Sequence, residues 1–566
     1  MDTIGEDMSS LAGKKVLIQR LEGAHREAFS KGRLQSEKPP RILIDIPKRE
    51  NQGDYSSNLA MLLSRSEGKP AREIAEILCA SLKDEEGLVD HVEVAGPGFI
   101  NFTMKPAWWH RVIQDILSSG RAYGASSAGR DRSVQIEYVS ANPTGPLHVG
   151  HGRWAAVGNA LANVMTAAGF RVEREYYNND IGRQVKLLGQ SVYARYQQTL
   201  GNPIPDPEDG YRGAYIQDIA DELIEKQGER FKGKPEEECL DAMGSASLEI
   251  MLERIRRDLS DFGIRFDHWF SEASLHKDGR VDEVLKELSQ KNYMQEKDGA
   301  LWFLSTQFGD DKDRVVKKED GAYTYLASDI AYHKNKLERG FDRVVNIWGA
   351  DHHGYIKRME AVVQALGYPR ERIKILIGQL VTLLRSGKPI PMSKRAGELI
   401  TLRDVLDEVG KDAALFFFLM RGLDSHLDFD LELAKEQSNE NPVYYVQYAH
   451  ARLSSVLRQA EERGISETGP ESADLSLLKE PEELKLIKRL AFFPELVEGA
   501  AEAMEPHRVT FYLQDLAGIL HNYYFKHRFI TDDLELSRAR LVLVRATRTV
   551  MANALGLLGV SAPDRM

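Results

Sequence analysis

Hydrophobic residues near the N-terminus alternate with polar ones in two places, and other patterns separate those places. The alternating residues are Ile42, Ile44 and Ile46 in the first place and Ile100, Phe102 and Met104 in the second. A period of two is typical of strands. Residues 54–65 carry a helical pattern, and Gly96-Pro97-Gly98 indicates a turn. These patterns predict a small α+β domain over residues 1–115, followed by a linker of small polar residues at 125–130.

A strand, a turn rich in glycine and proline, a helix and a second strand follow in that order. The first strand covers residues 134–139, the helix begins near Gly152, and the second strand covers residues 172–177. This order is the opening unit of a doubly wound, Rossmann-like sheet. The pattern predicts an α/β domain over residues 125–400, with a polar and mostly helical insertion at about 195–290.

Strand patterns return at residues 344–348 and 373–384, still within the α/β domain. Helical patterns then dominate the remainder of the chain. They predict a connecting helical segment over residues 401–440 and an all-α bundle over residues 441–566, built from long amphipathic helices.

Composition places the chain among ordinary globular proteins. Its 566 residues suffice for about three or four domains. No stretch approaches the roughly 20 apolar residues of a membrane span, and the N-terminus is acidic where a secretory signal is basic. We therefore expect a cytoplasmic protein with no membrane contact. Cys79 and Cys239 lie far apart without a CxxC partner, which argues against a disulfide framework and a cysteine zinc site.

The net charge of -11 argues, taken alone, against nucleic-acid binding. An acidic chain can still bind RNA if its basic residues gather on one face. Composition therefore leaves RNA binding open.

The segment 140–152 carries the strongest indication of chemistry, because it joins a strand to a helix. Ligands bind at the carboxyl ends of parallel strands, and backbone N–H groups at a helix start favour phosphate. Gly150 and Gly152 would let a nucleotide lie close to the backbone, and His148 and His151 could donate hydrogen bonds to phosphate oxygens. The alternatives are a metal-binding pair and two surface histidines on a turn.

Two short motifs carry a resemblance to a known family. Residues 147–151, Leu-His-Val-Gly-His, resemble the HIGH signature of class I aminoacyl-tRNA synthetases, and residues 140–151 resemble the arginine-specific branch. Downstream, Pro391-Met392-Ser393-Lys394-Arg395 resembles the KMSKS loop, which in this class is a lid over the ATP phosphates. Pro391 departs from the motif, because it replaces the first lysine; Lys388 is a candidate substitute. The alternative for Lys394 is a solvated loop lysine.

The resemblance implies a set of nucleotide contacts in two turns and the lid. We expect His148, His151 and Lys394 to be catalytic, because point charges and N–H donors there would stabilise the phosphates during displacement. The expected ATP-binding residues are Pro143, Gly145, His148, Gly150, His151, Gly349, Asp351, Met392, Ser393 and Lys394.

Arginine presents a planar guanidinium that favours carboxylates in a fixed geometry. Glu137 lies in the strand that leads to the phosphate turn, and Tyr325 and Asp329 stand four apart, on one face of a helix. The resemblance implies that both carboxylates contact arginine and that Asn142 holds its α-amino end. The expected arginine-binding residues are Glu137, Asn142, Tyr325, Asp329 and His352. The alternatives are that Glu137 is solvated and that Asp329 caps a helix. His352, His353 and Asp351 could also form a metal site.

Aromatic and basic residues interleave in the C-terminal region, as in surfaces that stack unpaired bases and bind phosphates. Aromatics at helical spacing are more often core, so the family resemblance decides. It implies an anticodon-binding bundle, and residues 53–61 and 94–102 resemble the family's N-terminal domain, which touches the outer corner of tRNA. The expected tRNA-binding residues are Tyr444, Gln447, Tyr448, Arg452, Tyr523, Lys526 and Arg528.

The resemblance implies an arginyl-tRNA synthetase activity. Its substrates would be L-arginine, ATP with Mg²⁺, and tRNA(Arg), and its products arginyl-tRNA, AMP and pyrophosphate. We expect a monomer without a protein-bound structural metal. Two rivals are a nucleotidyltransferase with another acceptor and a non-catalytic RNA-binding relative.

Overall fold

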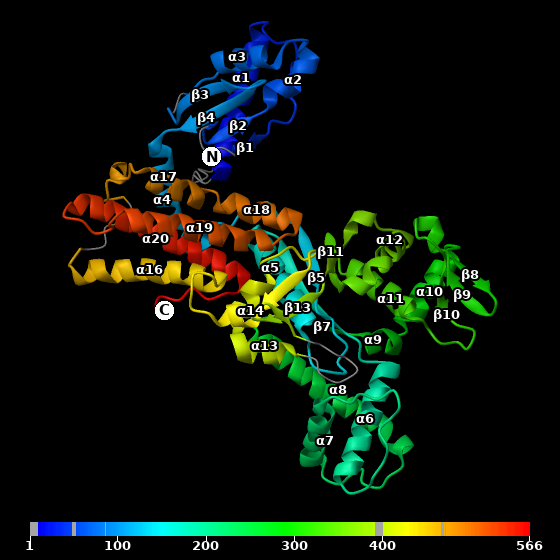
Figure 1. Ribbon diagram of the computed structural model, residues 1–566. Coiled ribbons are helices and arrows are strands. Elements are labelled where there is room, and N and C mark those ends of the chain that lie inside the picture. Colours follow the sequence, from blue (N-terminus) through cyan, green and yellow to red (C-terminus); the bar gives the residue numbers. More distant parts are fainter. Residues whose placement is uncertain (1–9, 48–51, 85–86, 391–399, 466–468, 470) are drawn as a thin grey trace.

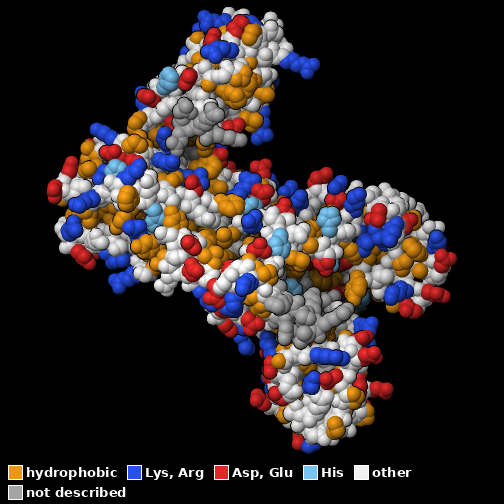
Figure 2. Space-filling model, viewed as in Figure 1, with side chains coloured by type: hydrophobic (Ala, Val, Ile, Leu, Met, Phe, Trp, Pro, Cys, Tyr) orange, Lys and Arg blue, Asp and Glu red, His pale blue; other side chains and the backbone are white. Residues whose placement is uncertain are grey.

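The computed structural model describes residues 10–47, 52–84, 87–390, 400–465, 469 and 471–566 (Figure 1). An N-terminal domain projects from a helical bundle, and two lobes project from a central parallel sheet. Figure 2 shows that acidic and basic side chains are intermixed on each projecting part of this face. No face of a single charge sign is therefore apparent on this side of the molecule.

The N-terminal domain is an antiparallel sheet of order β1-β2-β4-β3, covered by helices. Its elements are α1 (Ser10–Ser30), β1 (Ile44–Asp45), β2 (Tyr55–Ser57), α2 (Leu59–Glu67), α3 (Ala71–Ala80), β3 (Val89–Ala95) and β4 (Phe99–Met104). The helix predicted over residues 54–65 was wrong at its start. Tyr55 pairs with Phe102 of β4 and is 1% exposed, because tertiary pairing outweighs the local helical pattern.

The central region is built on five parallel strands in the order β12-β11-β5-β6-β7. The strands are β5 (Ser133–Glu137), β6 (Arg171–Asn178), β7 (His268–Ser271), β11 (Arg343–Gly349) and β12 (Ile373–Gly378), and α5 (Val149–Ala167) connects β5 to β6. From β5 the chain adds strands first on one side of the sheet, as β6 and β7, and then on the other side, as β11 and β12. In a doubly wound fold, ligands bind where the strand order changes direction in this way. This confirms the predicted fold class.

The segment predicted as a helical insertion contains part of the central sheet. The first projecting lobe consists of α6 (Arg183–Thr199), α7 (Ala214–Gln227) and α8 (Glu236–Asp261), and it has a hydrophobic core of its own. The chain then returns to form β7, which pairs with β6 in parallel. The four residues of β7 are too few for an alternating pattern to identify.

The second lobe follows β7 and packs around its own core. Its elements are α9 (Glu272–Lys277), α10 (Arg280–Gln290), β8 (Met294–Lys297), β9 (Ala300–Phe303), β10 (Arg314–Lys317), α11 (Tyr325–Glu338), the 3₁₀ helix η4 (Ala350–Tyr355) and α12 (Ile356–Ala365). Helix α11 lies where this lobe meets the sheet, so its side chains can reach the ends of the strands.

The connecting segment is a small mixed unit. Its elements are β13 (Val381–Arg385), β14 (Lys388–Pro389), α13 (Leu402–Val409), α14 (Lys411–Phe418), β15 (Leu427–Asp430) and α15 (Leu431–Lys435). The strand pattern at 373–384 belongs to two strands in different sheets, and the predicted helical segment contains β15, which pairs with β13 in parallel.

The C-terminal region is an all-α bundle, as predicted. Its helices are α16 (Pro442–Glu462), α17 (Pro481–Ala491), α18 (Phe493–Ala503), α19 (His507–Lys526) and α20 (Leu534–Leu558). Contrary to our expectation, α20 is long and apolar enough to pass a membrane-span test by length and composition. However, 61% of its most apolar window is buried, and α20 packs against α16 and α4 (Pro106–Ser119). It is a core helix of the bundle.

Candidate active site

The predicted phosphate turn ends in an N-cap that two histidines share. Helix α5 begins at Val149, three residues earlier than predicted, because His148 caps it. His148 Nδ1 accepts hydrogen bonds from the backbone N–H of Gly150 (3.1 Å) and of His151 (3.4 Å). In return, His151 Nδ1 accepts from the backbone N–H of His148 (3.3 Å). The capping box stabilises the start of the helix.

These bonds determine which nitrogen of each imidazole is the donor. Because each Nδ1 accepts a backbone hydrogen bond, the neutral ring carries its proton on Nε2. The rings of His148 and His151 stack, with centroids 3.6 Å apart and planes at 20°. Trp154 meets the pair edge-on, 5.3 Å from His151 and 6.3 Å from His148. The turn therefore places the Nε2–H groups of two stacked imidazoles at a helix N-terminus.

The other predicted nucleotide residues border the same edge of the sheet. Pro143 is buried, and Gly145 and Gly150 are half-buried in the turn. Because β11 pairs with β5 in parallel, Gly349 at the end of β11 lies at this edge, and the exposed Asp351 follows it in η4. At Gly150 an added Cβ would lie 2.9 Å from His148 Cε1, so a larger residue would displace the imidazole.

Residues 391–399 lie outside the described residues, and Met392, Ser393 and Lys394 fall among them. The chain that follows them pairs with the histidine turn. Thr401 bridges to His148, and the backbone N–H of Leu402 donates to the carbonyl of Leu147 at 2.7 Å. The lid motif and the histidine motif are therefore neighbours through their flanking backbone.

Asp329 lies on α11 at the base of the second lobe, and Tyr355 donates a hydrogen bond to its Oδ2 at 2.9 Å. Burial raises the pKa of Asp329 to about 7, and the negative charges of Glu272 and Glu137 contribute to the rise. A carboxyl group with this pKa is poised to ionise when a cation binds beside it. Asp329 does not cap a helix.

Glu272 is a second buried carboxyl group that sequence reasoning missed. It is 5% exposed and begins α9, directly after β7. Burial raises its pKa, although hydrogen bonds from Ser328 and Tyr177 oppose the rise. Burial raises the pKa of Tyr177, and the negative charges of Glu272 and Asp329 add to the rise. A sequence signal for Glu272 would have required the recognition of β7.

The remaining predicted arginine-binding residues have different surroundings. Glu137 is not solvated: it is 4% exposed and forms an ion pair with the fully buried Lys336. Asn142 is exposed and donates to Gln184 Oε1 at 2.6 Å. Tyr325 is 71% exposed at the start of α11.

His352 lies on η4, with its ring centroid 5.8 Å from that of Trp348. Its Nε2 is 3.6 Å from Oδ2 of the exposed Asp351. The metal alternative for His352, His353 and Asp351 finds no support, because the described residues contain no cluster of ligand atoms there.

An aromatic and cationic surface lies where α16 meets α19. The rings of Tyr444 and Tyr448 are stacked, with centroids 5.7 Å apart and planes at 10°. The Arg452 guanidinium lies 5.2 Å from the Tyr448 ring and 3.8 Å from the Tyr524 ring. Phe525 is 90% exposed, which is unusual for a large apolar side chain. We refer to these five residues as the stacking surface.

Two predicted tRNA-binding residues do not reach the surface. Gln447 is 9% exposed and donates to Asp412 Oδ2 (2.9 Å) and to the Ser561 carbonyl (3.0 Å), so it connects α16 to α14 and the C-terminal segment. Tyr523 is fully buried and donates to Glu483 at 2.9 Å. Both side chains are engaged inside the bundle, so the structure gives no support to their predicted contact with RNA.

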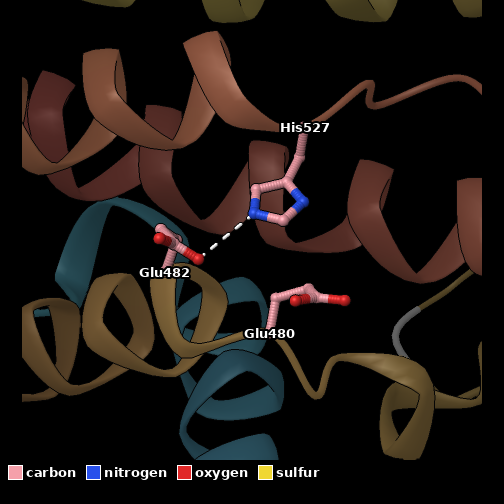
Figure 3. A group of neighbouring side chains, drawn as sticks. All are labelled: Glu480, Glu482 and His527. Carbon is pink, nitrogen blue, oxygen red and sulfur yellow. Dashed lines mark hydrogen bonds and ion pairs between the residues drawn. The ribbon is translucent and has the colours of Figure 1, made fainter.

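Lys526, the last residue of α19, and Arg528, which lies just beyond the helix, are exposed, consistent with contact to a ligand from outside. Lys526 pairs with Glu482 at 2.5 Å, and His527 contacts the same carboxylate at 3.2 Å. Glu480, Glu482 and His527 bring ligand atoms within 4.8 Å of one another (Figure 3). Within this group, Glu482 is paired with two basic side chains.

Comparisons with known proteins cover nearly the whole chain. Residues 112–417 match the family described as tRNA synthetases class I (R), catalytic domain. Residues 446–566 match the DALR anticodon binding domain, and residues 15–104 match the arginyl tRNA synthetase N terminal domain.

Full-length relatives agree with these matches. The chain is 50% identical over 551 residues to the arginine–tRNA ligase of Citrifermentans bemidjiense, covering 97% of this chain and 99% of that protein. It is 50% identical over 546 residues to the corresponding ligase of Geobacillus kaustophilus, covering 96% and 98%. The Thermus thermophilus arginyl-tRNA synthetase has the same fold, with a TM-score of 0.75, 24% identity and coverage of 98% and 100%.

Proposed function

The chain belongs to the class I arginyl-tRNA synthetases and ligates arginine to tRNA(Arg) with ATP, and from this premise we propose how its residues divide the work. The assignment confirms the expected activity and substrates. It excludes both rivals, the nucleotidyltransferase with another acceptor and the non-catalytic relative. The residue roles below are our proposal.

ATP binds at the histidine turn, with its phosphates at the start of α5. The observation that supports this most directly is the shared cap, which orients Nε2–H of both His148 and His151. In the first step the arginine carboxylate attacks the α-phosphate and pyrophosphate leaves. The two N–H donors and the helix N-terminus stabilise the charge that builds on the phosphate oxygens.

Groups outside the turn complete the proposed ATP site. Gly349 lets it approach the end of β11, with Asp351 beside it, and Lys394, with Met392 and Ser393, closes over the pyrophosphate. Mg²⁺ arrives on the ATP phosphates, which are hard oxygen ligands, and supplies charge neutralisation there. No structural metal is needed in this scheme.

Arginine binds between Asp329 and Glu272. Two buried carboxyl groups with raised pKa values are destabilised as a pair of anions, and a guanidinium relieves that cost because it offers donors to both. Glu137 contributes indirectly, since its charge is already compensated by Lys336. Asn142 contacts the α-amino end of arginine, and Tyr325 and His352 border the entrance.

The tRNA contacts both ends of the molecule. Unstacked anticodon-loop bases stack on the stacking surface, while Lys526 and Arg528 contact phosphates. The N-terminal domain, over residues 1–115, contacts the outer corner of the tRNA. The catalytic domain covers residues 125–400, a connecting segment covers 401–440, and the bundle covers 441–566. We propose a cytoplasmic monomer.

The experiment that tests this scheme is ATP–pyrophosphate exchange, measured with arginine and with each other amino acid, with and without tRNA. Exchange that is specific to arginine and appears only when tRNA is added would support the site and make the RNA part of its assembly. Exchange with arginine that survives the loss of both histidines would contradict the proposed nucleotide site.

A further inference from the structure

The lobe formed by α6, α7 and α8 contacts the phosphate turn, and a tyrosine makes one of these contacts. This lobe has a core separate from that of the sheet and projects away from it (Figure 1). Tyr215, the second residue of α7, donates a hydrogen bond from its hydroxyl to the carbonyl of Thr144 at 2.9 Å. Thr144 is 6% exposed and lies in the turn that leads to His148. A side chain of the lobe therefore holds the backbone of the turn.

The Tyr215 ring also packs closely against Gly145, the residue after Thr144. A Cβ added to Gly145 would lie 3.2 Å from the Tyr215 hydroxyl oxygen and 3.4 Å from its Cζ, which is tighter than most real Cβ contacts. Burial raises the pKa of Tyr215 well above its ordinary value, so the hydroxyl keeps its proton and acts as a donor at neutral pH. Within the described residues, no other group donates to the Thr144 carbonyl.

A second contact joins the lobe to the same turn. The side-chain amide of Asn142 donates to Gln184 Oε1 at 2.6 Å, near the start of α6. The lobe thus contacts the turn at Asn142 and at Thr144, on the approach to the stacked histidines. Other contacts hold the two ends of this segment: Tyr176 donates to the Ala141 carbonyl at 2.8 Å, and the backbone N–H of Leu402 donates to the Leu147 carbonyl at 2.7 Å. The lobe therefore holds the middle of the segment, at Asn142 and Thr144.

We propose that Tyr215 is a positioning residue for arginine activation, through which the helical lobe fixes the phosphate turn and the histidines that follow it. This inference rests on the proposed nucleotide site. Without the hydroxyl, the Thr144 carbonyl loses its donor and the turn can shift. The N–H donors of the turn then meet the phosphates less well as charge develops, while the carboxyl groups that bind arginine are unaffected.

The test compares Tyr215→Phe with a matched variant of the same lobe. Tyr193→Phe also removes one hydroxyl that donates to a carbonyl, that of Lys234 at 2.6 Å, but Tyr193 lies inside the lobe. We expect Tyr215→Phe to lower kcat for arginine-dependent ATP–pyrophosphate exchange about three- to ten-fold, the effect of one hydrogen bond. KM for arginine should change less than kcat, because the carboxyl groups that bind the guanidinium lie outside the turn. Tyr193→Phe should keep the kcat of the unmodified enzyme, although both variants lose comparable thermal stability.

A double-variant cycle tests the contact itself. Gly145→Ala should lower kcat in the unmodified enzyme, because the methyl group presses on the Tyr215 hydroxyl. The same substitution should lower kcat less in the Tyr215→Phe background, because Cζ at 3.4 Å then becomes the nearest ring atom. Additive effects, or equal losses of kcat in Tyr215→Phe and Tyr193→Phe, would overturn the inference. If Tyr215→Phe is fully active while His148 variants are not, the inference fails and the nucleotide site stands.

Discussion

Lys336 and Glu137 form a buried ion pair that ties α11 to β5. Lys336 is fully buried and Glu137 is 4% exposed, and the Lys336 ammonium also donates to Asn346 Oδ1 at 2.9 Å. Burial alone would raise the pKa of Glu137, but the charge and hydrogen bond of Lys336 outweigh it and hold that pKa below its ordinary range. The pair therefore fixes α11, which carries Asp329, on the edge of the sheet.

Replacing Lys336 with methionine should be strongly destabilising. It leaves Glu137 buried without a cation, which costs about 3–5 kcal/mol of the free energy of unfolding. Chemical denaturation measures the loss. The double variant Glu137→Gln with Lys336→Met should recover most of it, because no uncompensated charge remains. Lys226→Met, which removes an exposed ion pair on α7, should change little. Similar losses in both lysine variants would contradict the importance of burial.

Asp329→Asn and Glu272→Gln should each weaken arginine binding selectively. Each change removes one negative charge with almost no change in shape. Because hydrogen bonds to charged groups contribute about 1.5–3 kcal/mol, KM for arginine should rise about 10- to 100-fold, while KM for ATP stays the same. Steady-state exchange kinetics separate the two constants. Asp278→Asn, at the exposed C-terminal end of α9, is the matched control. A loss of ATP affinity equal to that of arginine would count against the assignment.

Arginine binding should release a proton near neutral pH. The pKa of Asp329 is raised to about 7, so a fraction of the free enzyme carries a protonated carboxyl group there. A bound guanidinium favours the anion and lowers that pKa. Affinity for arginine should therefore increase as the pH rises through about 7 and then level off.

The same shift affects stability with the opposite sign. The pKa of Asp329 is raised from 3.8, so the unliganded fold loses stability from this group as the pH rises toward about 7.

Calorimetric titrations with arginine at about pH 6.5, in buffers of different ionisation enthalpy, measure the proton release. At about pH 8 the buffer dependence should vanish. Equal buffer dependence at both pH values would exclude Asp329 as the source.

His148 has a structural role and a proposed chemical role, which two substitutions separate. Asparagine is a good N-cap and lacks the imidazole Nε2, whereas alanine lacks both functions. Both variants should lower the exchange rate about 10²- to 10³-fold. Only His148→Ala should lose about 1 kcal/mol of stability, because α5 loses its cap. Full activity in His148→Asn would restrict His148 to capping.

The parts of the site that follow local patterns could be predicted from the sequence. The histidine turn, the strand before it and the helix after it depend on neighbouring residues, and the structure has them in the predicted order. Strand β7 could not be identified in this way, because its four residues owe their conformation to pairing with β6. Glu272 was missed for the same reason.

The burial of particular polar side chains was the second feature that could not be predicted from the sequence. A glutamate in a strand before a ligand-binding turn has the same local sequence whether it faces a ligand or a buried lysine, and Lys336 is far from Glu137 along the chain. Likewise, Gln447 and Tyr523 lie in aromatic and polar runs that resemble an RNA surface. Only the packing of α16, α14 and α17 around them shows that they are internal.

The side chains of the stacking surface should contribute to tRNA affinity, and a buried residue of the same helix provides the control. Phe525→Ala removes an exposed ring that has no role in the core, so tRNA affinity should fall by the value of one stacked base, about 1–3 kcal/mol, or roughly 5- to 150-fold. Tyr523→Phe is the control, because Tyr523 precedes Tyr524 of the stacking surface and is itself fully buried. It should lower the free energy of unfolding without changing tRNA affinity.

Arg452 should behave differently from Phe525, because it carries a charge between two rings. If its guanidinium contacts a phosphate, Arg452→Met should reduce the slope of log affinity against log salt by about one, whereas Phe525→Ala should leave that slope unchanged. Fluorescence anisotropy of labelled tRNA at several salt concentrations measures both quantities. A weakened affinity with an unchanged slope in Arg452→Met would mean that Arg452 only supports Tyr448 and Tyr524, and that the phosphates are bound elsewhere on the bundle.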